Sequence, residues 1–144
     1  MSESGDAVAA FRLLMLTVLG QALSAAGYLL DGDPVSEAAG RFRFLAADKA
    51  DAELRIEFQV LAGTASEWAP QMPSRFRVTL FRQGAERTLA ALVAQDFGVE
   101  ILPSAEHWWS WQDSAELGAA LAEAGHLLVG FGIPWLNGEL EPPT

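Results

Sequence analysis

The chain has 144 residues, of which 51% are hydrophobic, and this is enough for one compact domain with a substantial core. It contains no cysteine, so disulfides, thiolate metal sites and a cysteine nucleophile are excluded. The formal net charge of −10 argues against nucleic acid and anionic membranes as ligands, because binding either of them requires a surplus of Lys and Arg. With no feature that assigns another compartment, the cytoplasm is the default.

The acidic charge is concentrated in the C-terminal part of the chain. All nine Lys and Arg residues lie at or before Arg87, together with 11 acids, whereas residues 88–144 carry eight acids and no Lys or Arg. An acidic surface of this kind usually keeps a small protein soluble. The alternative interpretation is a docking surface for a basic partner.

The first predicted element is a long helix over about residues 6–28. Asp6 is a suitable N-cap, and apolar residues then recur at helical spacing. No charged residue occurs from Leu13 to Leu30, so a membrane span or a signal peptide has to be considered. A polar stripe along the helix favours a mostly buried helix of a globular domain instead. This stripe consists of Thr17, Gln21, Ser24 and Tyr28.

The segment Asp31-Gly32-Asp33-Pro34 is expected to break this helix. Its Asp-x-Asp start is similar to that of a calcium-binding loop. That loop needs Gly at its sixth position and Glu at its twelfth, and these positions hold Ser36 and Phe42. We therefore predict a turn and no calcium site.

Four strands are predicted, over about residues 41–46, 53–61, 75–82 and 98–102. The first three alternate polar and apolar residues, which is typical of half-buried strands. The connection between the first two is short enough for a hairpin, and the third follows a looser stretch, so an antiparallel meander in chain order is expected. Their apolar residues then share one face, against which the first helix can pack. For residues 86–95 the sequence leaves helix and strand equally open.

The opposite face of this meander carries Arg41 and Arg43 on the first strand, Glu53, Arg55 and Glu57 on the central strand, and Arg75 and Arg77 on the third. Cross-strand Arg–Glu–Arg neighbours follow from this pattern. Exposed pairs of this kind contribute only about 0–1 kcal/mol each, so a solvated face is the simpler interpretation. The alternative is a recognition surface for a carboxylate-bearing or phosphate-bearing ligand, because Arg offers a bidentate fork.

Three of the five tryptophans lie between residues 108 and 111. If this segment is extended, Trp109 and Trp111 point to one face together with His107, and Trp108 points to the other. At least one of these large rings is expected in the core. The alternative is a pocket for a sugar or another flat ligand, lined by Trp108, Trp111 and Trp135 with His107 and Gln112 as polar partners.

The clearest helix start follows the tryptophans. Asp113-x-x-Glu116 forms a capping box, and apolar residues recur at helical spacing behind it over about residues 114–131. Gly132 and Pro134 are expected to end this helix. An acidic tail over residues 137–144 completes the chain.

Two C-terminal segments, Trp108-Trp109-Ser110-Trp111 and Gly132-Ile133-Pro134-Trp135-Leu136, flank the capped helix. This arrangement resembles the C-terminal signature of a bacterial family, domain of unknown function 4304. Ala26-Gly27-Tyr28, Glu57-Phe58-Gln59 and Phe76-Arg77-Val78-Thr79-Leu80 are similar to earlier positions of that family. The resemblance implies an α+β fold and a bacterial origin, and it brings no catalytic residue with it.

Catalytic motifs are missing from the sequence. There is no Gly-x-Ser-x-Gly nucleophile elbow and no Gly-Lys-Ser/Thr phosphate loop. The two histidines, His107 and His126, lack the compact spacing of a metal site. We therefore expect no enzymatic activity, no cofactor and no metal.

These patterns predict a single α+β domain, residues 1–144, with an antiparallel sheet of about four strands packed against long N- and C-terminal helices. The leading functional hypothesis is a non-enzymatic protein-binding module, immunity-like or chaperone-like, toward a basic partner. The alternatives are a sugar-binding or small-molecule-binding domain built on the tryptophans, and a dimeric secretion-chaperone-like protein. The candidate partner or ligand surface comprises Arg41, Arg43, Arg75, Arg77, His107, Trp108, Trp111 and Trp135.

Overall fold

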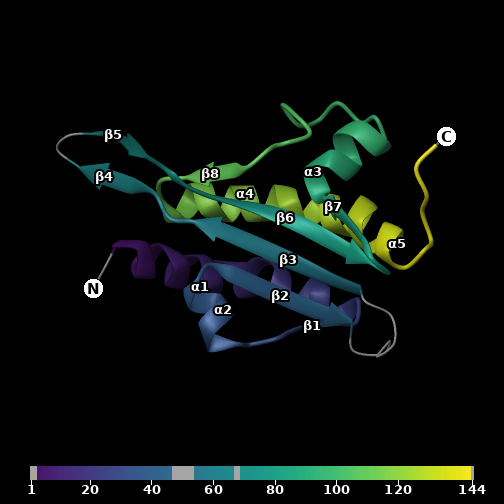
Figure 1. Cartoon of the computed structure of the whole chain (residues 1–144), viewed down its shortest axis with the longest axis horizontal. Coiled ribbons are helices and arrows are strands. Elements are labelled where there is room, and N and C mark those ends of the chain that lie inside the picture. The colour runs from purple at the N-terminus through teal and green to yellow at the C-terminus, as the bar shows by residue number, and fades with distance from the viewer. Residues whose placement is uncertain (1–2, 47–53, 67–68, 144) are drawn as a thin grey trace.

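The computed structural model of the chain describes residues 3–46, 54–66 and 69–143. An antiparallel sheet forms one layer, and two long helices, α1 (Glu3–Ala25) and α4 (Ser114–Leu127), lie behind it (Figure 1). This arrangement confirms the predicted α+β class with long helices near both ends of the chain.

The main sheet has six strands in the order β1-β2-β3-β6-β7, and β8 pairs with the other half of the β6 edge. All of its pairings are antiparallel. The strands are β1 (Tyr28–Leu30), β2 (Arg41–Ala46), β3 (Leu54–Leu61), β6 (Ser74–Arg82), β7 (Ala85–Thr88) and β8 (Trp109–Trp111). The predicted meander thus forms the centre of a larger sheet. The predicted start of β3, Glu53, lies outside the described residues.

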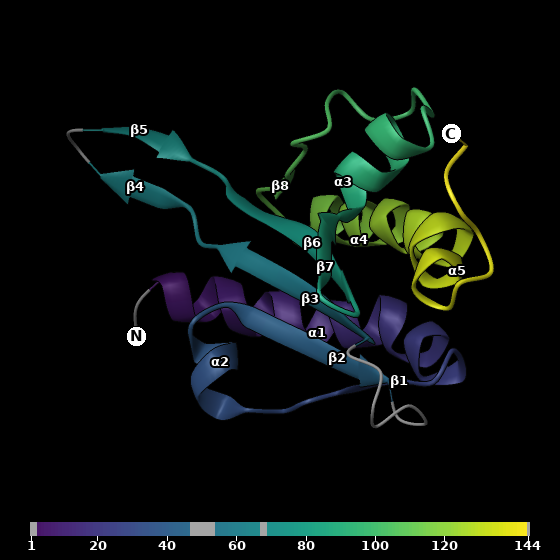
Figure 2. The same cartoon turned by 45° about the vertical axis from the view of Figure 1, so that its right-hand side comes forward.

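A second, two-stranded sheet interrupts the meander between β3 and β6. Its strands are β4 (Thr64–Ser66) and β5 (Ala69–Met72), and they project beyond the main sheet as a separate hairpin (Figure 2). A Cβ atom at Gly63, where the chain leaves β3, would collide with the backbone carbonyl of Met72. Glycine therefore permits the close approach of the two backbones at the base of this hairpin.

The core forms between α1 and the apolar face of the sheet. The ring of Phe11 on α1 lies 5.4 Å from that of Phe42, 5.2 Å from that of Phe76 and 5.8 Å from that of Trp111. Phe58 completes this aromatic centre, 6.1 Å from Phe11. Aromatic rings bury large apolar areas, so this cluster contributes strongly to the attachment of α1.

The first helix buries one narrow stripe, Phe11, Met15, Leu19 and Leu23, at a spacing of four residues. It ends at Ala25, and Gly27 then takes a positive φ of 92°. Tyr28 therefore lies in β1 and is 2% exposed, so its expected place in a polar helix stripe is wrong.

The segment 86–102 differs most from its prediction. Residues 86–95 combine both alternatives, because β7 is followed by the short helix α3 (Leu89–Ala91) and a π-helical turn, Leu92–Asp96. The predicted strand at 98–102 is wrong. Gly98 has a φ of 67° and a turn follows it, so the chain bends where a strand would have to stay extended.

The C-terminal helix starts as predicted and continues further. Asp113 accepts a hydrogen bond from the Glu116 amide at 2.8 Å, and Glu116 accepts one from the Gln112 amide at 2.7 Å. A π-helical turn, Leu128–Gly132, leads directly into α5 (Ile133–Leu136), so the predicted stop at Gly132 and Pro134 is wrong. Proline is tolerated there because it occupies the first turn of the new helix.

The predicted acidic tail is described from Asn137 to Pro143. Glu141 in this tail forms an ion pair of 3.0 Å with Arg82 at the end of β6, and Tyr28 donates a hydrogen bond of 3.1 Å to the Asn137 side chain. The tail is thereby fixed to the sheet and is not a free acidic extension along this part.

Candidate functional site

The outer face of the sheet is the face turned away from α1 and α4 (Figure 1). The predicted arginines lie on this face, because they alternate with buried residues along β2 and β6. Strand pairing aligns Arg41 of β2, Gln59 of β3 and Arg77 of β6 in one row across this face. Because Phe76 pairs with Trp109, the position beside Arg77 on the next strand belongs to Trp108. We call these four residues the Trp108 row.

Two guanidinium groups lie over the ring of Trp108. The guanidinium carbons of Arg75 and Arg77 are each 4.8 Å from the ring centroid. Cation–π contacts of this kind are worth about 0.5–1 kcal/mol each at exposed sites. Arg77 also donates from Nε to Gln59 Oε1 at 3.0 Å. The ring and the amide thus hold the Arg77 side chain in place on the open face.

The register separates the arginines of β6 from the acid of the central strand. Glu57 lies opposite Arg43 and Thr79, whereas Arg75 lies opposite Leu61. The ion pair of Glu57 is a loose one, 3.7 Å from Arg41. Within the described part of the chain, neither Arg75 nor Arg77 forms an ion pair with a carboxylate. The expected Arg–Glu–Arg rows are therefore staggered, and positive charge accumulates around Trp108.

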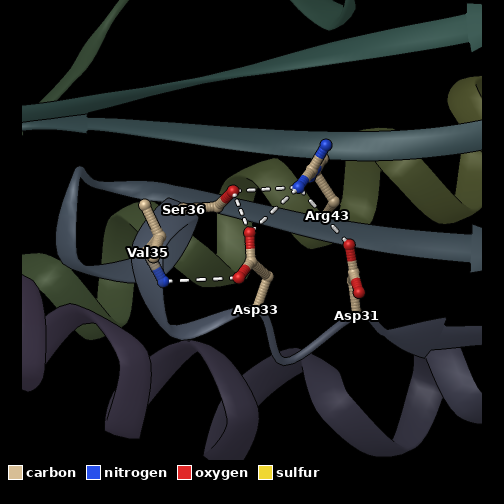
Figure 3. Close-up of polar contacts among 5 residues, drawn as sticks. All are labelled: Asp31, Asp33, Val35, Ser36 and Arg43. Carbon is tan, nitrogen blue, oxygen red and sulfur yellow. Dashed lines mark hydrogen bonds and ion pairs between the residues drawn. The ribbon is translucent and has the colours of Figure 1, made fainter.

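Arg43 belongs to a different, self-contained network (Figure 3). Its Nη2 atom donates to Ser36 Oγ at 2.9 Å and lies 3.5 Å from Asp31 and 3.6 Å from Asp33. Asp33 caps the short helix α2 (Pro34–Ala38) by accepting from Ser36 Oγ at 2.8 Å and from the Val35 amide at 3.4 Å.

The hydrogen bond from Ser36 is the main reason why the pKa of Asp33 lies below its ordinary value, with backbone hydrogen bonds and Arg43 acting in the same direction. This network fixes α2 to the sheet edge and occupies the Arg43 guanidinium. Of the four arginines predicted from the sequence, Arg41, Arg75 and Arg77 remain directed to the open face.

Two further residues belong to this face and were not among the predicted site residues. Gln59 orients Arg77, and Arg55 places its guanidinium carbon 3.9 Å from the Phe81 ring centroid. The Nε atom of Arg55 is buried without a hydrogen-bond partner among the described residues. Period-two alternation puts both on the outer face, but only the strand register shows that Gln59 neighbours Arg77 and that Arg55 neighbours Phe81.

Trp111 and Trp135, the other two tryptophans of the predicted pocket, do not join Trp108 in a ligand-binding wall. Trp111 and Trp135 are only 7% and 6% exposed. Trp111 stacks on Phe11 in the core, whereas Trp135 lies beneath Arg82, whose guanidinium carbon is 4.2 Å from the ring centroid. Arg82 is five residues beyond Arg77 along β6, which corresponds to about 17 Å. The structure therefore separates the three predicted pocket residues.

His107 is half-buried and turned toward the core side of the tryptophan segment. Its ring meets Trp109 edge-on at 4.8 Å. Burial lowers the pKa of His107, and the nearby carboxylate of Glu123 partly opposes this shift. Glu123 in turn accepts a hydrogen bond from Trp109 Nε1 at 3.1 Å. Among the residues that the structure describes, no group of three or more His, Asp or Glu side chains is arranged to hold a metal ion.

Comparison of the chain with models of protein families, with curated proteins and with solved structures gives no match. The resemblance to the domain of unknown function 4304 family therefore stays a prediction. Any functional proposal rests on the chain's own residues and their geometry.

Proposed function

We propose that the chain is a non-enzymatic protein-binding module that holds an acidic segment of another protein on the outer face of its sheet. The observation that supports this proposal is the pair of guanidinium groups, Arg75 and Arg77, positioned over Trp108 on an open face. Guanidinium groups bind carboxylates through two parallel hydrogen bonds, and a supporting aromatic ring reduces the entropy lost on binding.

The spacing of the Trp108 row favours an extended peptide over a single small anion. The row crosses four neighbouring strand positions from Arg41 to Trp108, a distance of about 14 Å at the usual strand separation. An extended chain covers this distance with about four residues. Carboxylates on alternate residues of such a segment would reach both the Arg41 end and the Arg77 end of the row.

The structure favours an acidic partner over the basic partner that the sequence suggested. Of the eight acids after Arg87, Asp96 pairs with Arg87 and Glu141 pairs with Arg82. Asp113 and Glu116 form the capping box, and Glu123 accepts a hydrogen bond from Trp109. These five acids have structural roles, so fewer carboxylate oxygens of the C-terminal part are free to bind a basic protein than its composition implies.

Binding of a hexaglutamate peptide at low salt tests this proposal. We expect the wild-type protein to bind the peptide with a change in tryptophan fluorescence, because Trp108 lies in the binding row. Arg77→Gln should weaken binding at least about tenfold, since it removes a charge-assisted hydrogen-bond donor. Arg12→Gln is the matched control, because Arg12 is paired with Glu37 at 2.8 Å, away from this row.

The control variant loses the same charge, so its affinity should stay within about twofold of wild type. Absence of hexaglutamate binding, or equal losses in the two variants, would contradict the acidic-segment proposal. Stronger binding of hexalysine than of hexaglutamate would support a basic partner instead.

A further inference from the structure

The two long helices leave an apolar surface on the side of the molecule opposite the Trp108 row. Only 22% of the apolar stretch Asp6–Ala25 is buried, although this stretch is long and apolar enough to pass for a membrane span, a property that core helices share. Large side chains remain open to solvent on both helical segments. Leu13 is 68% exposed, Val18 is 38% exposed and Val129 is 57% exposed.

A groove runs along the line where the two helical segments meet. It has a volume of about 180 Å³, and its walls include Val18 and Ala22 from α1 and Ala122, His126 and Val129 from the α4 side. At its floor the helices approach so closely that a Cβ atom at Gly125 would collide with the Leu19 side chain. The groove is thus built into the packing of α1 on α4.

The residues that line this groove include no carboxylate, in a chain with a net charge of −10. From Leu13 to Ala25, α1 has no charged residue. The two acids of α4, Glu116 and Glu123, lie on its other flank, where they bond to the Gln112 amide and to Trp109. His126 is the one titratable side chain among the groove residues.

We propose that a second copy of this chain docks on the surface formed by α1 and α4, so that the protein is a symmetric homodimer. Two chains of this charge repel one another, and contact through a groove lined without carboxylates avoids placing carboxylates against carboxylates. A two-fold axis lets the exposed Val18 and Val129 of each copy cover the groove of the other.

The charge pattern also argues against other occupants. A strongly acidic or basic partner would find no counter-charge here. An anionic membrane would repel the chain, and Arg12, the one cation on α1, is paired with Glu37 at 2.8 Å. The groove residues include no tryptophan, tyrosine or phenylalanine, the side chains that usually anchor a helix at a lipid interface.

Sedimentation equilibrium of the full chain tests the dimer. We expect the wild-type protein to sediment at twice the mass of one chain at micromolar concentrations. Val129→Glu should raise the dimer dissociation constant at least about tenfold, because it buries a charge opposite an apolar surface. Val35→Glu is the matched control, since Val35 is a 78% exposed valine on α2, outside this surface, and the change gives the same net charge.

A wild-type protein that stays monomeric would overturn the proposal. A dimer that Val35→Glu weakens as much as Val129→Glu does would also overturn it, as would a dimer that neither Val129→Glu nor Ala122→Glu weakens. If monomers co-sediment with uncharged phosphatidylcholine vesicles and Val129→Glu abolishes this binding, the surface binds a membrane and the dimer proposal is overturned. Trp108→Ala should leave dimerisation unchanged. Failure of hexaglutamate binding and failure of dimerisation are therefore separate results.

Discussion

Trp108 and Trp109 are neighbours in the chain and lie in opposite environments. Trp109 is 4% exposed, stacks on Phe76 with centroids 5.4 Å apart and donates to Glu123. Trp108 lies on the outer face beneath two arginines. The alternation of an extended backbone predicts this separation, and it gives one ring a role in packing and leaves the other for recognition.

Replacing these two rings should have unequal effects on stability. We expect Trp109→Ala to lower the free energy of unfolding by about 3–5 kcal/mol, as for other large core aromatics. Trp108→Ala should lower it by about 1 kcal/mol, since it removes only exposed cation–π contacts. Chemical denaturation of both variants measures the difference. Equal, small losses would mean that Trp109 does not anchor the C-terminal helix to the sheet.

Tyr28 provides a pH-dependent test of the β1 position. Burial raises its pKa to about 12 from the ordinary value of 10.0. The folded protein therefore keeps the phenol protonated where the unfolded chain releases the proton, so this contribution to stability is present below pH 10.0 and is lost as the pH rises toward about 12.

Tyr28 is the chain's one tyrosine, so phenolate absorbance reports it alone. We expect a midpoint near 12 in the native protein and one near 10.0 in denaturant. A native midpoint that matches the denatured one would show that the phenol is solvent-exposed.

Among the elements, the strands with strict alternation are the ones that the sequence predicts best. β2, β3 and β6 lie within one residue of their predicted bounds along their described parts, because each buries alternate side chains in the core, with Thr79 of β6 buried as well. The short strands β1, β7 and β8 have only three or four residues, too few for a periodic signal. The predicted strand at 98–102 failed because its apolar residues pack around a turn after Gly98.

The connection between α2 and β2 gives a test at this scale. Gly40 has a φ of 84°, and a Cβ atom there would lie 2.5 Å from the Val60 carbonyl oxygen. Gly27 has a similar φ of 92° but open space around it. We expect Gly27→Ala to cost about 1 kcal/mol from backbone strain alone, and Gly40→Ala to cost about 2–4 kcal/mol because the edge of β3 must also shift. Thermal or urea unfolding of the two variants measures these losses of stability. Similar losses for Gly27→Ala and Gly40→Ala would contradict the steric part of this prediction.

At the scale of the whole molecule, the two proposed surfaces respond to charge in opposite ways. Arg75 and Arg77 make the sheet face locally cationic, whereas the groove between α1 and α4 is lined by residues without a formal charge, in a chain with a net charge of −10. Hexaglutamate binding depends on attraction between opposite charges. Dimerisation has to overcome repulsion between two acidic chains.

Salt should therefore separate the two events. Raising sodium chloride from about 0.02 M to about 0.3 M shortens the screening length from about 20 Å to about 6 Å. We expect this change to weaken hexaglutamate binding and to strengthen the dimer. Isothermal titration and sedimentation at both salt concentrations provide the measurement. A dimer that dissociates as salt rises would indicate that ion pairs, and not the apolar groove, hold the copies together.

The sequence by itself determined the fold class, the central strands, the capping box at Asp113 and the division of the tryptophans between two faces. These features depend on local periodicity and on short-range hydrogen bonds, which are visible in neighbouring residues. It also placed Arg41, Arg75 and Arg77 on one face of the sheet.

Only the tertiary structure decided which of these side chains meet. The strand register places Gln59 and Trp108 beside Arg77. Glu57 forms an ion pair with Arg41, whereas Arg43 is held in the network around Asp33 and is not available on the open face. A shift of one residue in strand pairing would change every one of these neighbours. Register is set by the packing of the whole apolar face against α1, and this long-range condition leaves no local mark in the sequence.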